Sequence, residues 1–312
     1  MYRYAVVRDA GKTYIVWTKT HAIYDRWSKM HLMEDIRECF LDPTAFARGP
    51  SRPPFRKFAE FVDSLDRKSS IDYWTSQLQG LPDAQPLLPE SKEGAFITSK
   101  THSVRKTISY TRPKQAKVSF DAIAQVGWAL TLANLSGLDD IFFCTFRSCR
   151  QMSLSGVQDI IGPLWSLIPV RRRLDAQQSL HNLLTQVYDD TVAGIPHEPF
   201  GLPALEKHFG HKRFLQSVIL PQPPRPDTFG GEVVARGKNG KEFRLRSADE
   251  LWGQTRGHFG LYIMLTPKAG DTLELWARYD DRVLDAEKVE RIVGQYMEVL
   301  EKLFAGKSQT LA

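Results

Sequence analysis

The feature that most constrains the fold is an apolar run at residues 141–146, Ile-Phe-Phe-Cys-Thr-Phe. A strand that is apolar on both faces has to be covered on both sides, so this run predicts a central strand of a layered sheet. A helical apolar pattern over residues 120–135 precedes it. Alternating strands at 259–265 and 272–279 and an amphipathic helix at 289–303 follow. The sequence therefore predicts an α/β (α+β) protein with mixed sheets.

The N-terminal part has a different character. Residues 2–8 and 12–20 are rich in Tyr, Val, Ile, Trp and Thr, with turn residues between them, and they predict a β-hairpin. Residues 82–95 are rich in Pro, Glu and Gly and show little periodicity, which is typical of a linker. A chain of 312 residues is long enough for two domains. We therefore expect a boundary near residue 90, between parts 1–90 and 91–312.

Composition and charge narrow the classes of partner. The formal net charge is +6, but the basic residues are scattered, without a zinc finger, an RNP-like motif or a basic helix. This pattern argues against a nucleic-acid partner and suits a protein partner with an acidic surface. There is no apolar run long enough for a transmembrane helix, so no membrane partner is expected. Three cysteines favour a reducing, cytoplasmic location over a disulfide framework.

Most short motifs that would carry other chemistry are weak or absent. His208 and His211 stand three residues apart, but no Cys or carboxylate joins them at ligand spacing, so we expect surface histidines and no metal site. The sequence contains no P-loop, GxGxxG or GxSxG motif, which argues against nucleotide binding and serine-hydrolase chemistry. His197-Glu198-Pro199 is interpreted as a turn that closes a helix end.

The loop after the predicted hairpin carries the candidate chemistry. Residues 20–28 read Thr-His-Ala-Ile-Tyr-Asp-Arg-Trp-Ser and lie between a strand and an amphipathic helix, for which the last serine is the predicted N-cap. Such a junction can hold an imidazole at the mouth of a cleft. The HxxxD spacing of His21 and Asp25 decides little, because His31 and Asp35 share it. That second pair lies one helical turn apart and is expected on the surface.

Several separate segments resemble one known family, in the family's order along the chain. They are Thr20–Ser28, Asp72-Tyr73-Trp74, Leu138-Asp139-Asp140, Arg147-Ser148-Cys149-Arg150, Ile161-Gly162-Pro163 and Tyr279-Asp280-Asp281. On these segments the chain resembles the condensation domain of nonribosomal peptide synthetases, a relative of acyl-CoA-dependent acetyltransferases. The likeness runs through nearly all of the chain and is far more specific than the HxxxD spacing.

The resemblance implies a fold and an activity. The family fold is two lobes of the chloramphenicol-acetyltransferase type, arranged in a V with a tunnel between them. The implied activity is an acyltransferase that forms an amide (or ester) bond between carrier-bound acyl or peptidyl thioesters. No cofactor or metal is expected to bind the domain directly, because the substrates are carried on phosphopantetheine arms. The implied partners are carrier-protein domains.

The family motif, His-His-x-x-x-Asp-Gly, also implies roles for three residues. Its functional second His corresponds to His21 and its Asp to Asp25, whereas Thr20 replaces the first His and Arg26 the Gly. The motif Asp is structural in the family and pairs with an Arg in a Ser-Gly-Arg segment. Here that segment is Ser-Cys-Arg and ends at Arg150. The hydroxyl residue before the His is similar to terminal condensation domains of fungal synthetases, which release a peptide by cyclisation.

One departure from the family keeps two alternatives open. The chain begins only one hairpin before His21, whereas the family's N-terminal lobe begins well before its motif. Residues 1–90 are therefore expected to form a partial, incomplete N-terminal lobe, and residues 91–312 the C-terminal lobe. The chain can then be an inactive truncated domain that acts at most as a carrier-protein-binding module. It can also be a stand-alone acyl-CoA acyltransferase, although the Asp-Phe-Gly-Trp-Gly segment of one such branch is absent.

Overall fold

The structure is a computed structural model, and by its internal contacts it divides into two compact units. It describes residues 2–46, 52–81, 96–98, 102–114, 117–209, 216–222, 233–236, 242–245, 255–268 and 270–306. Unit 1 comprises the segments 1–65, 148–165 and 228–247. Unit 2 comprises the segments 66–147, 166–227 and 248–312.

The two units are interleaved along the sequence. The chain leaves unit 1 after Leu65, and the segment 148–165 returns to it. The predicted boundary near residue 90 lies outside the described residues, so the division into 1–90 and 91–312 stays a prediction. The contact units have other bounds because residues 148–165, which contain Arg150, pack with the N-terminal segment that contains Asp25.

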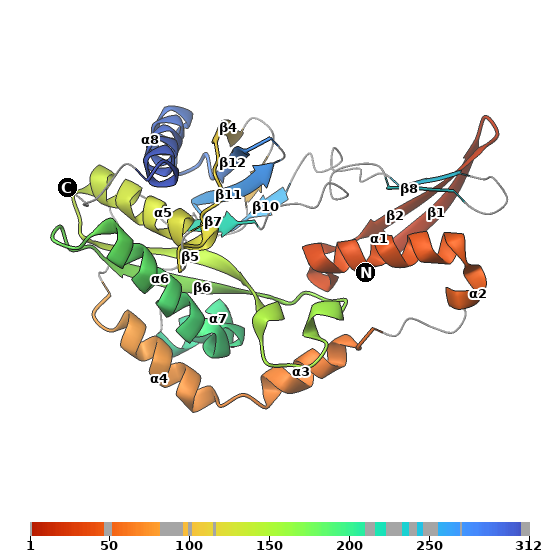
Figure 1. Cartoon of the computed structure of the whole chain (residues 1–312), viewed down its shortest axis with the longest axis horizontal. Coiled ribbons are helices and arrows are strands. Elements are labelled where there is room, and N and C mark those ends of the chain that lie inside the picture. The colour runs from red at the N-terminus through yellow and green to blue at the C-terminus, as the bar shows by residue number, and fades with distance from the viewer. Residues whose placement is uncertain are drawn as a thin grey trace. The chain divides into compact units, whose positions relative to one another are not determined.

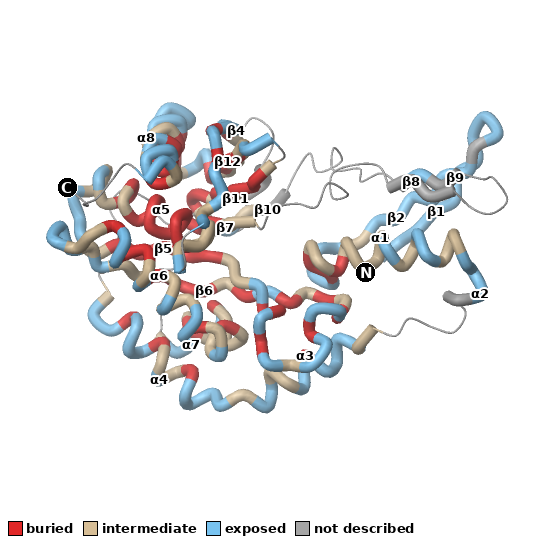
Figure 2. The backbone as a smooth tube through the Cα atoms, viewed as in Figure 1, coloured by how far each residue is buried: buried red, intermediate tan, exposed pale blue. Residues whose placement is uncertain are grey.

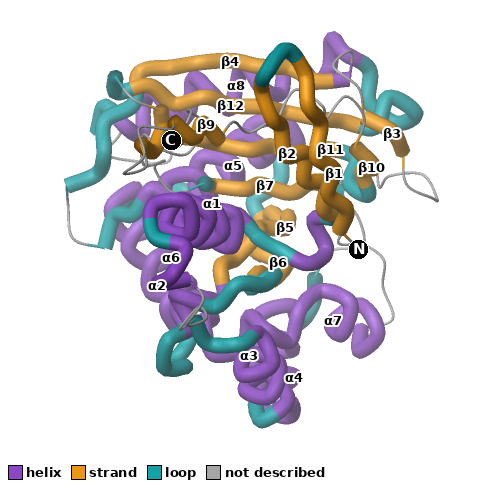
Figure 3. Tube along the Cα trace, turned by 90° about the vertical axis from the view of Figure 1, so that its right-hand side faces the viewer, coloured by secondary structure: helices purple, strands orange, loops and turns teal. Residues whose placement is uncertain are grey.

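A six-stranded mixed sheet forms the centre of unit 2. In spatial order its strands are β4 (Ser103–Ser109), β12 (Thr272–Tyr279), β11 (Leu261–Lys268), β7 (Ser217–Pro221), β5 (Asp140–Ser148) and β6 (Trp165–Arg173), as Figure 3 shows from top to bottom. Strand β12 pairs antiparallel with β4 and β11, whereas β7 pairs parallel with β11 and β5. The predicted mixed sheet is confirmed. The apolar run lies in β5, where residues 141–145 are all buried.

Helices cover this sheet, and two of them supply much of the core. The helices of unit 2 are α4 (Arg67–Leu78), α5 (Phe120–Ser136), α6 (Leu180–Gly194), the 3₁₀ helix η5 (Ile195–Phe200), α7 (Gly201–Phe209) and α8 (Ala286–Phe304). Helix α5 begins after Ser119, whose hydroxyl accepts the N–H of Ala122 at 3.0 Å, and ends at Gly137 in the left-handed conformation. Figure 2 shows buried residues concentrated in α5 and the strands beside it. Trp128 of α5 meets Tyr296 of α8 edge to face, with ring centroids 5.1 Å apart.

Unit 1 begins with the predicted hairpin, which is confirmed. Strands β1 (Tyr2–Asp9) and β2 (Lys12–Lys19) pair antiparallel, and a two-residue turn joins them. Both turn residues, Ala10 (φ 45°) and Gly11 (φ 75°), lie in the left-handed region that a type I′ turn requires. The remaining elements of unit 1 are η1 (His21–Ile23), α1 (Arg26–Leu41), α2 (Pro43–Phe46), α3 (Phe55–Asp63), η3 (Cys149–Gln151), η4 (Val157–Asp159), β8 (Val233–Arg236) and β9 (Glu242–Leu245); Figure 1 labels α1, α2, α3 and β8.

The structure bears on two expectations from the sequence, the lack of a transmembrane helix and the lack of a disulfide framework. None of the helices in the described part of the chain is long and apolar enough to span a bilayer. All three cysteines are free thiols, and Cys144 and Cys149 are buried. Burial raises the pKa of the Cys144 thiol well above its ordinary value, so this cysteine behaves as a small apolar core residue.

Candidate functional site

His21 lies on the short connection between β2 and α1. After β2 the chain makes one 3₁₀ turn, η1, and becomes extended again at Tyr24 (φ −154°, ψ 154°). The His21 side chain is exposed, and its ring stacks on the buried ring of Tyr24 with centroids 4.7 Å apart and planes inclined by 24°. One side of the imidazole is therefore supported by an ordered aromatic ring while the residue remains accessible.

Asp25 begins helix α1 as its N-cap. Its carboxylate accepts the N–H of Ser28 at 2.7 Å, and the Asp25 N–H donates to Ser28 Oγ at 3.4 Å, which completes a capping box. The N-cap predicted at Ser28 is therefore wrong, because Ser28 is the third residue of the helix. Asp25 is only 7% exposed, so this carboxylate is a buried charge that needs a partner.

Arg150 supplies that partner. Its Nη2 donates to both carboxylate oxygens of Asp25, at 2.9 and 2.8 Å, and its Nε donates to Oδ2 at 3.2 Å. Its Nη1 lies 3.2, 3.0 and 2.9 Å from the carbonyl oxygens of Val157, Gln158 and Ile160. Every guanidinium nitrogen thus has an acceptor, which matters for a side chain that is 2% exposed. The structure brings Asp25 and Arg150 together within unit 1.

The segment after η4 provides backbone hydrogen-bond donors to Asp25 and Ser28. The Leu164 N–H donates to Asp25 Oδ2 at 3.2 Å, and the Gly162 N–H donates to Ser28 Oγ at 2.8 Å. A Cβ at Gly162 would overlap the ring of Phe55, so only glycine permits this close approach. The Ile-Gly-Pro segment therefore contributes backbone donors to the site rather than side-chain chemistry.

Lys19 is a neighbour of this loop that sequence reasoning missed. Its Nζ lies over the rings of Trp17 and Tyr24, 4.3 and 4.0 Å from their centroids. Burial, with repulsion from Lys29, lowers the pKa of Lys19 to about 8. The available signal was the placement of Trp17 and Lys19 two residues apart, on one face of a strand.

We expect the stability of the chain to rise between pH 8 and pH 10.5 because of Lys19. The folded chain releases this proton near pH 8 and the unfolded chain near pH 10.5, so the unfolded state binds more protons in that window. After solvent screening the expected rise is about 1 kcal/mol. Urea unfolding from pH 7 to 10.5 measures it. Lys19→Met should remove the rise and Lys57→Met should keep it, whereas equal slopes in both variants would contradict the assignment.

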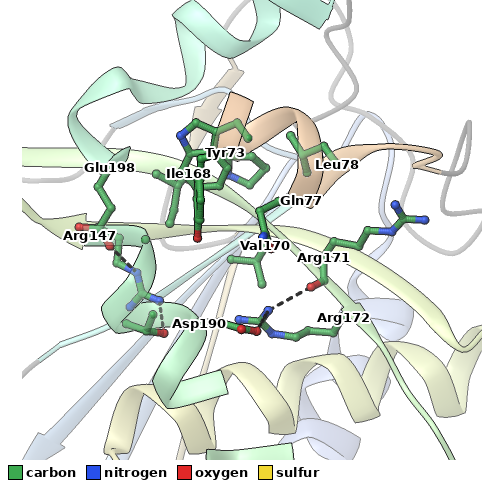
Figure 4. A pocket seen from close by; sticks show the side chains of 14 residues that line it. Tyr73, Gln77, Leu78, Arg147, Ile168, Val170, Arg171, Arg172, Asp190 and Glu198 are labelled. Carbon is green, nitrogen blue, oxygen red and sulfur yellow. Dashed lines mark hydrogen bonds and ion pairs between the residues drawn. The ribbon is translucent and has the colours of Figure 1, made fainter. Parts of the chain in front are cut away.

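A second polar site lies within unit 2, around a cavity of about 40 Å³. Figure 4 shows its lining, which includes Tyr73, Gln77, Arg147, Ile168, Val170, Arg172, Asp190 and Glu198. Arg147 Nε lies 3.4 Å from Glu198 Oε1, and its Nη1 donates to Asp121 at 2.6 Å. Arg172 Nη1 donates to Asp190 at 3.2 Å. The site is a network of ion pairs among α5, β5, β6, α6 and η5, and α4 contributes lining residues.

The turn predicted at residues 197–199 is the helix η5, and it carries a buried acid that sequence reasoning missed. Glu198 is 3% exposed. Burial raises the pKa of Glu198 to about 7, despite the attraction of Arg147. The His197 ring stacks on Tyr73 with centroids 4.3 Å apart, and burial lowers the pKa of His197. Nothing in the local sequence distinguishes a buried Glu from a surface one at a turn.

Glu198 is expected to make the stability of the chain fall as the pH rises from about 4.5 to about 7. The folded state binds this proton more tightly than the unfolded state, so its contribution is present in full below pH 4.5 and is lost through pH 7. The expected loss is about 3 kcal/mol. Glu198→Gln should flatten the profile in a series of chemical denaturations, and the exposed control Glu301→Gln should leave it as in wild type. A wild-type profile without the fall would contradict the raised pKa.

Of the two histidines expected on the surface, the structure describes only His208. His208 lies near the C-terminal end of α7, and His211 lies outside the described residues. Where the side chains are described, no group of three or more His, Cys, Asp or Glu could hold a metal ion.

Comparisons with known proteins bear on the whole chain. Residues 1–312 match the family model described as "Condensation domain". Nonribosomal peptide synthetase GRA1 of Gibberella zeae is 28% identical over 306 residues, which are 96% of this chain and 4% of the relative. Cyclochlorotine synthetase of Talaromyces islandicus is 26% identical over 309 residues, covering 96% of this chain and 5% of the relative. The chain thus spans a small part of the length of these curated relatives.

A solved structure supports the fold. The first condensation domain of the CDA synthetase superposes with a TM-score of 0.67 at 16% identity, over 99% of this chain and 69% of that one. At this identity the likeness bears on the fold alone. The chloramphenicol-acetyltransferase-like fold class predicted from the sequence is confirmed.

Proposed function

The chain belongs to the condensation-domain family, and from this membership we propose that it joins two carrier-bound substrates by an amide (or ester) bond. The observation that carries the proposal is the placement of His21. This residue is exposed on a loop whose next turn is fixed by the buried pair of Asp25 and Arg150. An accessible imidazole on an ordered support is the arrangement that a reaction between two delivered substrates requires.

In the proposed reaction the amine (or hydroxyl) of the acceptor attacks the thioester carbonyl carbon of the donor. The new C–N or C–O bond forms, the C–S bond breaks, and the donor arm leaves as a thiol. The attacking group has to lose a proton, which ends on the departing sulfur: His21 either accepts it and passes it to the thiolate, or orients the attacking group through a hydrogen bond while the proton moves to the thiolate. Holding both substrates in place can lower such a bimolecular barrier by roughly 7–11 kcal/mol.

Asp25 and Arg150 have a structural role in this proposal. The carboxylate of Asp25 already accepts hydrogen bonds from Ser28, Arg150 and Leu164. With its oxygens occupied and its charge neutralised, Asp25 is unsuited to accept a proton from substrate. The pair instead fixes the start of α1, and with it the connection that carries His21.

The proposed partners are carrier-protein domains that present acyl groups on phosphopantetheine arms, and the chain itself binds no cofactor. The net charge of +6 supports a carrier with an acidic surface. We also propose a role in the secondary metabolism of a fungal synthetase, because the relatives named above come from fungi, and a cytoplasmic location, because three cysteines suit a reducing compartment. The hydroxyl of Thr20 before His21 favours the terminal, cyclising subtype of condensation domain.

The test is a reaction of the purified chain with two loaded carrier proteins. One carrier bears an acyl thioester and the other an aminoacyl thioester, and intact-protein mass spectrometry follows the transfer. We expect the acceptor carrier to gain the mass of the acyl group, at a rate that falls with added salt because exposed charges are screened. Absence of transfer would leave the inactive carrier-binding alternative. Transfer from acyl-CoA but not from a carrier would favour the stand-alone acyltransferase.

A further inference from the structure

The second HxxxD pair of the sequence is part of a network rather than a surface pair. Arg52 joins its two members: Arg52 Nη1 lies 3.0 Å from His31 Nδ1, and Arg52 Nε and Nη2 donate to Asp35 Oδ1 at 3.0 and 2.8 Å. The Asp35 side chain is 16% exposed and that of Arg52 18% exposed. The pair expected on the surface is half-buried, and Arg52 joins its two members.

The second ring nitrogen of His31 contacts a carbonyl oxygen that also binds Arg150. His31 Nε2 lies 2.8 Å from the carbonyl oxygen of Gln158, which also accepts from Arg150 Nη1 at 3.0 Å. The Gln158 side chain in turn donates from Nε2 to the carbonyl oxygen of Arg150 at 2.5 Å. Helix α1 is thus tied to Arg150 at two places, directly through Asp25 and indirectly through His31 and Gln158.

These contacts define the protonation state of His31. A guanidinium can only donate, so His31 Nδ1 has to accept from Arg52 and carries no proton. A carbonyl oxygen can only accept, so His31 Nε2 carries the proton and donates to Gln158. The geometry therefore requires the neutral imidazole with its proton on Nε2.

We propose that His31 is a positioning residue, which holds the Gln158 carbonyl against Arg150 and thereby fixes the ion pair that supports the His21 loop. The inference concerns the contacts within unit 1, and only its effect on catalysis rests on the proposed function. Without His31 the Gln158 carbonyl keeps only the donor from Arg150, and α1 loses its second connection to η4. A small displacement of the loop is enough to slow a reaction that depends on placement.

Three carboxylates surround the Arg52 guanidinium that contacts His31. Glu34 and Asp35 on α1 and Asp159 on η4 lie within 4 Å of the Arg52 guanidinium. A second proton on His31 would turn Nδ1 into a donor facing a donor, and would place two like charges together. The contact with Arg52 therefore fits only the imidazole that carries a single proton, on Nε2.

The experiment compares two substitutions at His31 by NMR and by the carrier assay. Glutamine keeps a donor and an acceptor and does not titrate, whereas leucine removes both. In the wild-type chain we expect ¹⁵N shifts of a neutral His31 with the proton on Nε2. We expect the Arg150 Nε–H to exchange slowly in wild type and in His31→Gln, and markedly faster in His31→Leu. We expect kcat to fall roughly 100-fold in His31→Leu and to stay near the wild-type value in His31→Gln.

The exposed His181 of α6 provides a matched control. His181→Leu should change neither kcat nor the exchange of Arg150. A proton on His31 Nδ1, or Arg150 exchange that is equal in His31→Leu and wild type, would overturn the inference. If the wild-type chain forms no product, the proposed function fails and the exchange data alone decide the positioning role. If His31→Leu does not fold, loss of slow Arg150 exchange in His31→Gln would also overturn it.

Discussion

Asp25→Ala is expected to lower the free energy of unfolding by about 3–5 kcal/mol, the largest stability effect we predict. The substitution leaves the guanidinium of Arg150, which is 2% exposed, without its charged partner. It also removes the N-cap of α1, whose share is about 1 kcal/mol. Urea denaturation followed by circular dichroism measures the change. A free energy of unfolding equal to that of wild type would contradict the structural importance of the pair.

Three further substitutions separate the ion pair from the cap. Asparagine is also a good N-cap, so Asp25→Asn keeps the cap. It should still show most of the loss in free energy of unfolding that is expected for Asp25→Ala. Asp285 caps α8 by accepting the Lys288 N–H at 2.7 Å, and it is exposed. Asp285→Ala should therefore cost only about 1 kcal/mol. Adding Arg150→Met to Asp25→Asn should restore part of the loss, because the unpaired buried charge is then gone.

His21→Ala is expected to reduce the rate of condensation at least about 100-fold. The imidazole is the only group of the loop that we assign to proton transfer or orientation of the acceptor. Because His21 is exposed, its loss should change the free energy of unfolding by no more than about 0.5 kcal/mol. Asp25→Ala is thus expected to lose stability together with the support of His21, whereas His21→Ala should lose activity while keeping its stability.

The layered fold could be predicted from the sequence because its signals are local. The continuous apolar run of β5 reflects a strand that is buried on both faces. The alternation of apolar residues in β11 and β12 reflects strands that are more deeply buried on one face. The sequence predicts the N-cap of α1 at Ser28, whereas the structure places it at Asp25. Both residue types cap helices, and the apolar periodicity does not distinguish between them. The capping box, visible only once both backbone N–H groups are placed, decides it.

The candidate site could be predicted only in part. The resemblance supplied His21, Asp25 and Arg150, and the structure places the last two in contact. The residues that were missed owe their properties to tertiary packing. Glu198 becomes a buried acid, and Arg52 joins His31 to Asp35, through elements that are distant in the sequence. No spacing rule within one segment can show contacts of this kind.

Single-turnover transfer between two loaded carriers, in wild type and His21→Ala side by side, tests the central claim most directly. Rapid quenching and mass spectrometry of the acceptor carrier give the rate, and circular dichroism verifies that both chains are folded. We expect transfer in wild type and a loss of at least about 100-fold in the folded variant. Equal rates in the two chains would contradict the assignment of His21 as the centre of the reaction.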